Sequence, residues 1–258
     1  MRVHIQRVPD GKITLQETSK VAIITISRPA ARNALTASMW GELARIGRMA
    51  GQSPKAKVIL LRGTPGQFTA GADIKEFCQM TVEEAEQAFV QMEEAISVFE
   101  AVPMPVVAVV DGPAMGAGFI LSLACDMRIG TPLAQMAFPV GRLGITAGPS
   151  FMRRIIRQIG PSRATELVYT GKVLDAREAE KLGLFNTLVA SEELDKAALS
   201  LAGTIMEQSG ASLTAVKRAA QACQWTQDEP WSFVDSTDFP EGCLAFAQKR
   251  KPRFATRK

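Results

Sequence analysis

The sequence predicts an α/β fold in which β-β-α units repeat along residues 1–190 and a helical module follows over residues 191–258. Two observations support this prediction. Runs with strand character alternate with runs of helical spacing up to about residue 190, and only helical spacing remains after it. With 258 residues, 47% hydrophobic and 22% charged, the chain is long enough to bury a full core. No low-complexity linker separates the two regions, so we expect the helical module to pack on the core or on a neighbouring subunit.

The first half of the repeat region opens with two strands. Its predicted elements are, in order, strands over 12–18 and 21–28, a helix that begins at Thr36, a strand over 57–63, a short helix that carries Asp73 and Glu76, and a helix from Thr81 to about Glu100. The last helix has a strong start signal, because Thr81 and Glu84 form a capping-box pattern. Pro103 and Pro105 end it.

The second half begins with an apolar, β-branched run over residues 106–112, which predicts a strand buried on both faces. A glycine turn then leads into a buried helix near Ala117. The remaining predictions are strands over 126–130 and 134–138, a Gly-rich loop over 141–150, helices over 151–160 and from the Asp175–Glu178 capping box, and a strand over 185–190. Helices over about 191–208, 211–224 and 240–250 complete the chain, with apolar residues that need a partner surface: Leu194, Leu199, Leu201, Ile205 and Leu213.

The chain contains one histidine, His4, in an N-terminal segment that we expect to fray. Ser-His-Asp and Cys-His catalysis and His-rich metal sites all need imidazoles held in a rigid site, so these classes are disfavoured. We expect no metal and no separate cofactor. Tyr169, the only tyrosine, has helical spacing with Leu167 and is predicted to pack rather than to react.

The cysteines and the N-terminus bear on where the protein resides. The four cysteines lie far apart with no CxxC pair, which favours buried free thiols over a zinc or disulfide framework. The first 15 residues lack the apolar core of a secretory signal, and no apolar run approaches the roughly 20 residues of a membrane span. A cytoplasmic location without membrane association is therefore expected.

The net charge of +4 is concentrated at the C-terminus. Six of the 30 basic residues lie within the last ten positions, which leaves 24 basic against 26 acidic residues in the rest of the chain. This basic tail is either a solvated terminus or a site for anionic phosphates. Phe254 is its only aromatic residue, so the interleaving typical of nucleic-acid binding is missing and we do not expect a nucleic-acid partner.

Two glycine-bracketed turns, at residues 68–77 and 111–120, each enter a short helix after a buried strand. A helix N-terminus carries unpaired N–H donors and a partial positive charge, so two such termini that converge would form an oxyanion hole. The alternative is an ordinary pair of tight turns that pack a helix on a sheet. The spacing matches neither GxGxxG nor GxxxxGK[ST], which argues against a dinucleotide or P-loop site.

Six segments, in this order, carry a resemblance that covers essentially the whole chain: ISRPAARNALT, FTAGADIKEF, DGPAMGAGFILSLACDMRIG, FPVGRLGITAGPSF, TGKVLDAREAEKLGLFN and EGCLAFAQKRKPRF. The sequence resembles the enoyl-CoA hydratase/isomerase, or crotonase, family. The resemblance implies a crotonase-type spiral of β-β-α units that binds acyl-CoA. It also implies a C-terminal helical trimerisation module over residues 191–258, and hence a homotrimer or a dimer of trimers (a hexamer).

Roles in acyl-CoA binding follow from the resemblance, position by position. Ala72 and Ala117 match the residues whose backbone N–H groups bind the thioester oxygen. The second position is usually glycine, so the methyl group of Ala117 could restrict φ. The expected substrate-binding residues are Arg28, Ala30, Ala70, Asp73, Ile74 and Gly116, together with Phe246 and Lys249, which match tail positions that reach the CoA of a neighbouring subunit.

Two positions depart from the family pattern. Hydratases of the family use two glutamates, which activate the attacking water and protonate the α-carbon of the substrate. Ile120 and Val140 occupy these positions here, so a standard hydration mechanism lacks its acid and base. The acid Asp126 is expected to serve packing at a strand start, and Asp73 and Glu76 are expected to cap or to neighbour CoA. Three functions stay open: an enzyme running isomerisation, decarboxylation or hydrolysis through a thioester enolate or oxyanion; a silent acyl-CoA binder; and nucleic-acid binding through the tail.

Overall fold

The computed structural model describes residues 2–8, 11–18 and 20–221, together with the single residues Glu241, Ala245, Gln248, Arg250 and Arg253. The expected substrate-binding residues Phe246 and Lys249 lie outside the described residues, as does most of the helix expected over 240–250. Within the ranges described, no helix combines the length and the apolarity needed to cross a membrane.

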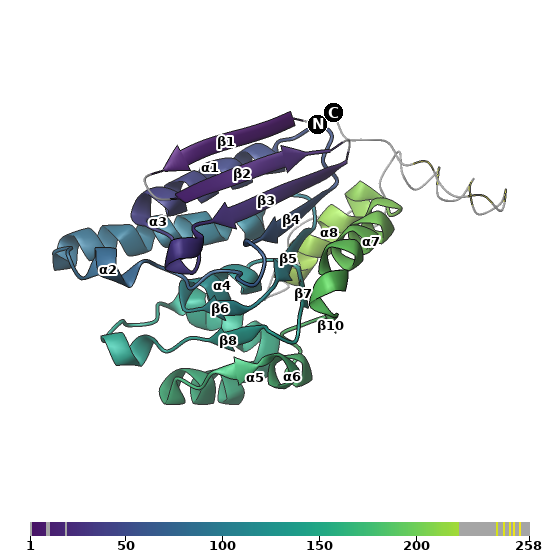
Figure 1. Cartoon of the computed structure of the whole chain (residues 1–258). Coiled ribbons are helices and arrows are strands. Elements are labelled where there is room, and N and C mark those ends of the chain that lie inside the picture. Colours follow the sequence, from purple (N-terminus) through teal and green to yellow (C-terminus); the bar gives the residue numbers. More distant parts are fainter. Residues whose placement is uncertain are drawn as a thin grey trace, which may run out of the picture.

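A seven-stranded sheet forms the centre of the fold, in the order β1-β2-β3-β4-β5-β7-β10 (Figure 1). Its strands are β1 (Arg2–Val8), β2 (Gly11–Glu17), β3 (Val21–Ser27), β4 (Val58–Arg62), β5 (Val106–Val110), β7 (Met127–Gly130) and β10 (Thr187–Leu188). The first three strands pair antiparallel, and every pair from β3 to β10 is parallel. Parallel pairs need crossover connections, so the segments between these strands supply the helices and the second sheet.

The second sheet has three strands, β6 (Pro113–Met115), β8 (Gln135–Ala137) and β9 (Leu174–Asp175), and two isolated bridges extend the pattern, Leu35 with Ala72 and Thr69 with Ala114. Successive turns of the chain repeat one order: a strand of the large sheet, a short paired segment, then a helix. The sets β5-β6-α4 (Ala117–Leu123) and β7-β8-α5 (Pro149–Thr170) are two such turns. The predicted repetition of β-β-α units is confirmed.

Helix starts follow the capping signals of the sequence. In α1 (Ala37–Gly51), the hydroxyl of Thr36 accepts a hydrogen bond from the N–H of Met39, and α2 (Ile74–Phe77) is capped by Asp73. The capping boxes predicted for α3 (Val82–Ala101) and α6 (Ala176–Lys181) both form. The short 3-10 helices η1 (Pro29–Ala31), η2 (Val140–Leu143) and η3 (Ser191–Glu193) complete this set. These caps depend on neighbours within three residues, which is why the sequence reveals them.

The middle of the large sheet is buried on both faces, and β5 shows this most simply. Alternate side chains of a strand point to opposite faces, and every residue of β5 is buried. One set packs into the main core with α1 and α3, and the other packs under α7 (Leu194–Met206): Val106, Ala108 and Val110 on the first face, Val107 and Val109 on the second. The strand predicted to be buried on both faces is therefore confirmed.

The last described helices, α7 and α8 (Gly210–Gln221), pack on the core of their own chain (Figure 1). Leu194, Ala198 and Ala202 of α7 are buried against the sheet. Leu199, expected to share this apolar stripe, is 51% exposed. It differs because it lies one position beyond Ala198 on the helix and so faces away from the sheet.

Three expectations from the sequence are wrong. The segment around His4 forms β1 and pairs with β2 along its full length, because an antiparallel neighbour satisfies its backbone. Tyr169 is 85% exposed rather than packed, and Cys78 is exposed rather than buried. By contrast, the helix expected over 151–160 does stop at Gly160, where the backbone of α5 is non-helical (φ 76°, ψ 164°), and a second helical stretch follows to Thr170.

Candidate functional site

The two glycine turns, whose convergence the sequence left open, lie in direct contact. Thr69 forms a parallel bridge with Ala114, and its carbonyl accepts a hydrogen bond of 3.0 Å from the N–H of Met115. Gly71 has φ 88°, and a Cβ placed there would lie 2.5 Å from the oxygen of Met115 and 3.0 Å from the nitrogen of Ala117. Only glycine permits both this backbone conformation and this approach. The segment 69–72 therefore lies against the N-terminus of α4.

The N–H group of Ala72 is left unpaired by the way its segment binds Leu35. The N–H of Leu35 donates to the oxygen of Gly71 over 2.8 Å, and the N–H of Asp73 donates to the oxygen of Leu35 over 2.9 Å. In a parallel bridge of this kind, the residue between the two bonded groups directs its own N–H away from the partner strand. Within the described residues the N–H of Ala72 donates no hydrogen bond.

Ala117 is the first residue of α4, where backbone N–H groups have no partner inside the helix. The first intrahelical bond runs from the N–H of Ile120 to the oxygen of Gly116, over 3.2 Å. Gly116 takes φ 54°, whereas Ala117 does not have a positive φ. The alanine methyl group is accordingly accommodated without backbone strain, and the N–H of Ala117 has no acceptor among the residues described.

Two of the predicted substrate-binding residues pair with each other. Nη1 of Arg28 lies 2.6 Å from Oδ2 of Asp73, and both side chains are mostly buried. This hydrogen bond from Arg28 is the main reason that the pKa of Asp73 is lowered; the N–H of Lys75, which Asp73 caps at the start of α2, acts in the same direction. The ion pair ties the loop after β3 to the segment that follows Ala72.

The other predicted binding residues lie on the segments that the pair and the two turns connect. Ala30 is exposed in η1, and the side chain of Ile74 is 38% exposed at the start of α2. Ala70 is half-buried, and its N–H donates to the oxygen of Arg32 over 3.0 Å. Gly116 stands at the N-cap of α4. The sequence positions assigned to one site are therefore close in the fold, apart from the two in the tail that the structure does not describe.

The nearby acids have structural partners. Oε2 of Glu76 accepts a hydrogen bond of 2.9 Å from the N–H of Ala37, in the first turn of α1, which confirms it as a capping residue. Oδ2 of Asp126 accepts bonds of 2.8 Å from the N–H of Val106 and from Nζ of Lys217, which confirms its expected place at a strand start. Neither carboxylate is a free acid or base next to the two N–H groups.

Ile120 and Val140, the positions at which the resemblance implies glutamates, are both buried. Ile120 is 0% and Val140 is 9% exposed, and both belong to the main hydrophobic core. Charged side chains are rarely placed in such surroundings without a partner, because leaving water costs several kcal/mol. These two positions are apolar by sequence and apolar by environment.

Asn33 lies in the matching segment ISRPAARNALT, but the sequence assigned it no role in the site. It is completely buried and has φ 54°, in the left-handed region. Its side chain bonds both to the loop after β3 and to residues 64–68. The available signal was the residue type, since asparagine tolerates positive φ better than other side-chain-bearing residues.

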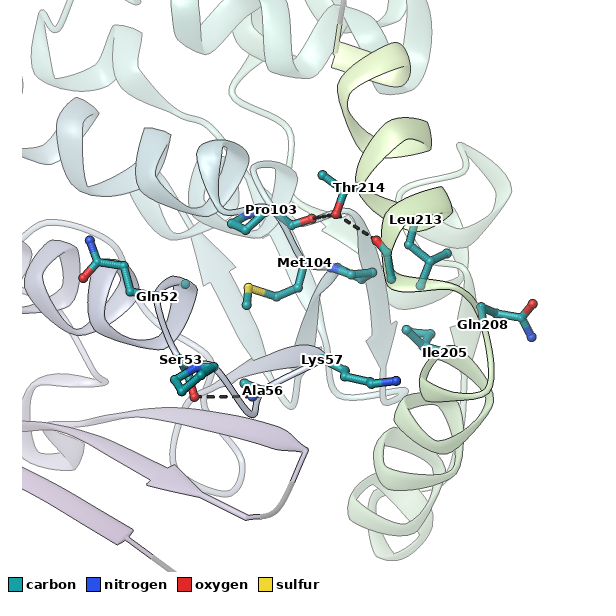
Figure 2. A pocket seen from close by; sticks show the side chains of 14 residues that line it. Gln52, Ser53, Ala56, Lys57, Pro103, Met104, Ile205, Gln208, Leu213 and Thr214 are labelled. Carbon is teal, nitrogen blue, oxygen red and sulfur yellow. Dashed lines mark hydrogen bonds between the residues drawn. The ribbon is translucent and has the colours of Figure 1, made fainter. Parts of the chain in front are cut away.

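Two cavities lie away from the glycine turns. One, of about 250 Å³, lies between the end of α1, the 103–105 segment and the α7–α8 junction (Figure 2). Two polar groups on its wall have partners: the hydroxyl of Thr214 donates to the oxygen of Pro103 over 2.8 Å, and Oγ of Ser53 accepts from the N–H of Ala56. The other, of about 370 Å³, lies beside α5 and α8. Neither wall includes a residue of the two turns.

A metal centre has no counterpart in the described part of the chain, where no group of three His, Cys, Asp or Glu side chains could hold a metal ion. Arg250, one of the six basic tail residues, forms an ion pair of 2.8 Å with Glu241. Part of the positive charge of the tail is therefore neutralised by an acidic residue of the same chain.

Comparison with known proteins gives one consistent result. Residues 16–257 match the family model for enoyl-CoA hydratase/isomerase. A protein named "Probable enoyl-CoA hydratase" from Mycobacterium leprae is 34% identical, covering 92% of this chain and 95% of its own. Crotonyl-CoA hydratase of Syntrophomonas wolfei is 31% identical, with coverage of 95% and 98%. The crystal structure of enoyl-CoA hydratase from Bacillus anthracis is 30% identical, with a TM-score of 0.85 and coverage of 94% and 98%.

The order of motifs, the spiral of β-β-α units and these comparisons agree along almost the whole chain. The protein belongs to the enoyl-CoA hydratase/isomerase family.

Proposed function

We propose that the protein binds acyl-CoA thioesters and stabilises the negative charge that develops on the thioester oxygen with the N–H groups of Ala72 and Ala117. The observation that supports this proposal is the pairing of two facts. The segments that carry these groups are in contact, and both N–H groups lack an acceptor within the described residues. Unpaired donors at a helix start and in a parallel bridge favour an anion.

The chemistry that such donors assist is formation of an enolate or a related oxyanion. When a base accepts a proton from the α-carbon, or an α-carboxylate leaves as CO₂, the bonding electron pair stays on the substrate, moves into the carbonyl and places negative charge on its oxygen. Two fixed N–H groups lower the energy of that charge without reorganising water, and removing one typically costs two to three orders of magnitude in rate. This supports a lyase or isomerase of CoA thioesters, as the names of the relatives suggest.

Arg28 and Asp73 have a limited role in CoA binding under this proposal. Because the two side chains neutralise each other at 2.6 Å, they would contact CoA through their shape and not as a free charge. Ala70 and Ile74 contribute a small side chain and a partly exposed apolar one along the same border. Phosphate contacts are then left to the basic tail, in keeping with the expected places of Phe246 and Lys249.

The test uses dimethylaminocinnamoyl-CoA, a conjugated thioester whose absorption moves to longer wavelength as hydrogen bonds polarise its carbonyl. Binding to the protein should produce a red shift that free CoA competes away. The same preparation is then assayed for turnover of enoyl-, β-hydroxy-, malonyl- and aryl-CoA thioesters. Binding of the thioester without a red shift would contradict the proposed use of the two N–H groups.

A second candidate, a catalytically silent acyl-CoA binder, is favoured by the burial of Ile120 and Val140 in apolar surroundings. Here the two residues support an apolar acyl pocket, and no acid or base is needed. The distinguishing result is a red shift and micromolar binding with no turnover of any thioester in the panel. Turnover of any one of them contradicts this second function.

We also propose assembly into a homotrimer or a dimer of trimers. Leu199 on α7 and Val216 on α8 are exposed apolar side chains on the module that the resemblance assigns to trimerisation. Sedimentation equilibrium measures the mass directly. A stable monomer across the micromolar range would refute the assembly.

A further inference from the structure

Asn33 holds together two loops that are distant in the sequence. Its Oδ1 accepts a hydrogen bond of 2.8 Å from the N–H of Arg28, and its Nδ2 donates to the oxygens of Gln67 at 3.1 Å and Phe68 at 3.2 Å. Nδ2 also lies 3.0 Å from the hydroxyl of Thr64. The amide has only one workable orientation, because reversing it would set its oxygen against two carbonyl oxygens and its NH₂ against an N–H.

The main chain of Asn33 extends this link toward Ala72. Its carbonyl accepts a hydrogen bond of 2.6 Å from the hydroxyl of Thr69, and that hydroxyl accepts one of 3.0 Å from the N–H of Gly71. The neighbouring residues Arg32 and Leu35 bond to the same segment. The bonds from Thr69 to Asn33 and from Gly71 to Thr69 are buried, so the loss of either one leaves a buried polar atom without water.

On its other side, the segment over residues 69–71 packs closely against the start of α4. A Cβ at Gly71 would lie 2.5 Å from the oxygen of Met115, and one at Gly118 would lie 2.6 Å from the oxygen of Thr69. Residues 69–71 are thus confined between the Asn33 loop and the start of α4. A shift of the loop changes the distance and the angle between the N–H groups of Ala72 and Ala117.

We infer that Asn33 is a positioning residue, which sets the Ala72 N–H group relative to α4 and so completes the anion-binding pair. The inference rests on the proposed function of that pair. Asparagine suits the position for two reasons: it tolerates φ 54°, and its amide offers an acceptor to one loop and donors to the other. Displacements near 1 Å in such sites can change rates by about a hundredfold.

The experiment measures the red shift of bound dimethylaminocinnamoyl-CoA in wild type, Asn33→Ala and a control, Leu194→Ala. Leu194 is buried in the separate core under α7, so its truncation lowers stability without touching residues 64–72. We expect Asn33→Ala to lose most of the red shift and to bind this thioester at least tenfold more weakly. Its affinity for free CoA, which has no acyl carbonyl, should stay within about twofold. The control should keep the full red shift.

Asn33→Asp adds a readout that reduced stability alone does not produce. Aspartate keeps the acceptor for Arg28 but faces the oxygens of Gln67 and Phe68, so its neutral form is favoured and its pKa is raised. Once protonated, the carboxyl donates to one of these oxygens. The red shift in this variant should therefore grow as the pH falls from 8 to 5, while that of wild type stays constant. A diminished red shift that does not change with pH would contradict the inference.

The outcomes separate this inference from the function on which it rests. Absence of a red shift in wild type contradicts the proposed anion site itself. A wild-type red shift that persists unchanged in folded Asn33→Ala overturns only the role of Asn33. If that variant does not fold, Thr69→Val removes the hydroxyl between Asn33 and Gly71 with little change in volume, and an unchanged red shift in it overturns the inference equally.

Discussion

Arg28 and Asp73 are 45 residues apart in the sequence and form an ion pair of 2.6 Å in the fold. The pair joins the loop that follows β3 to the N-cap of α2, the residue that directly follows Ala72. It is the clearest long-range link in the candidate site, and two predictions follow from it.

Replacing Asp73 by asparagine removes the charge from both the ion pair and the α2 cap. We expect the free energy of unfolding to fall by about 1–3 kcal/mol, the range for a hydrogen bond to a charged group. Urea denaturation at pH 7 measures the change. Asp195→Asn is the matched control, because Asp195 pairs with Arg62 at 2.7 Å but its side chain is 67% exposed, and such a pair contributes under about 1 kcal/mol.

The lowered pKa of Asp73 predicts how stability depends on pH. A carboxylate with a lower pKa in the folded state contributes stability above its unfolded pKa of about 3.8, and this is lost as the pH falls through the folded value. The difference in unfolding free energy between wild type and Asp73→Asn should therefore be constant from pH 7 to about 5 and shrink below about pH 4. A difference that grows on acidification would show that Arg28 does not stabilise the charged form.

Replacing Ala117 by proline removes one N–H group of the proposed pair. Proline is tolerated at the first position of a helix, so the fold should survive. We expect the red shift of the bound cinnamoyl thioester to fall sharply and any turnover to drop by two orders of magnitude or more. Ala176→Pro, at the first position of α6, is a control with the same chemistry in a helix outside the site. If the two prolines had equal effects on the red shift, the N–H group of Ala117 would not be a donor to the thioester oxygen.

A methyl group at Gly71 should force the two turns apart. Its Cβ would lie 2.5 Å from a backbone oxygen that cannot easily move, at a residue with φ 88°. Gly66→Ala isolates the backbone part of this effect, because Gly66 has φ 77° and open space around it. We expect Gly66→Ala to cost about 1 kcal/mol of stability with the red shift intact. Gly71→Ala should lower the stability further and abolish the red shift. If the two variants behaved equally, the close contact of Gly71 with the second turn would be contradicted.

Lys217 should be a stability determinant for α8. Its buried Nζ donates to the oxygens of Phe99 and Met104 and pairs with Asp126 at 2.8 Å. Lys217→Met removes a buried donor from all three acceptors and the cation from the carboxylate of Asp126, and we expect a loss of about 3–5 kcal/mol in thermal or urea denaturation. Lys172→Met, which breaks the solvent-exposed pair with Glu178, is the control, and its loss of stability should be much smaller because water screens that pair.

Local signals predicted much of the architecture. The cap at Thr36 and the boxes at Thr81 and Asp175 depend on side chains that reach backbone groups within three residues, and all form as expected. The burial of β5 on both faces follows from its unbroken apolar run, which is rich in β-branched residues. Strand β1 was missed because a strand near the end of a chain depends on its pairing partner, here β2, and its own residues do not reveal that partner.

Within the candidate site, the sequence revealed which residues are present but not which of them are in contact. The sequence by itself determined the family resemblance, the two glycine turns, and the absence of carboxylates at Ile120 and Val140, since these depend on the order of residues alone. Only the tertiary structure decided that Gly71 touches Ala117, that Asn33 joins both loops, and that Arg28 pairs with Asp73. Such contacts join residues tens of positions apart, and they form only when the closed spiral offsets the entropy of bringing those segments together.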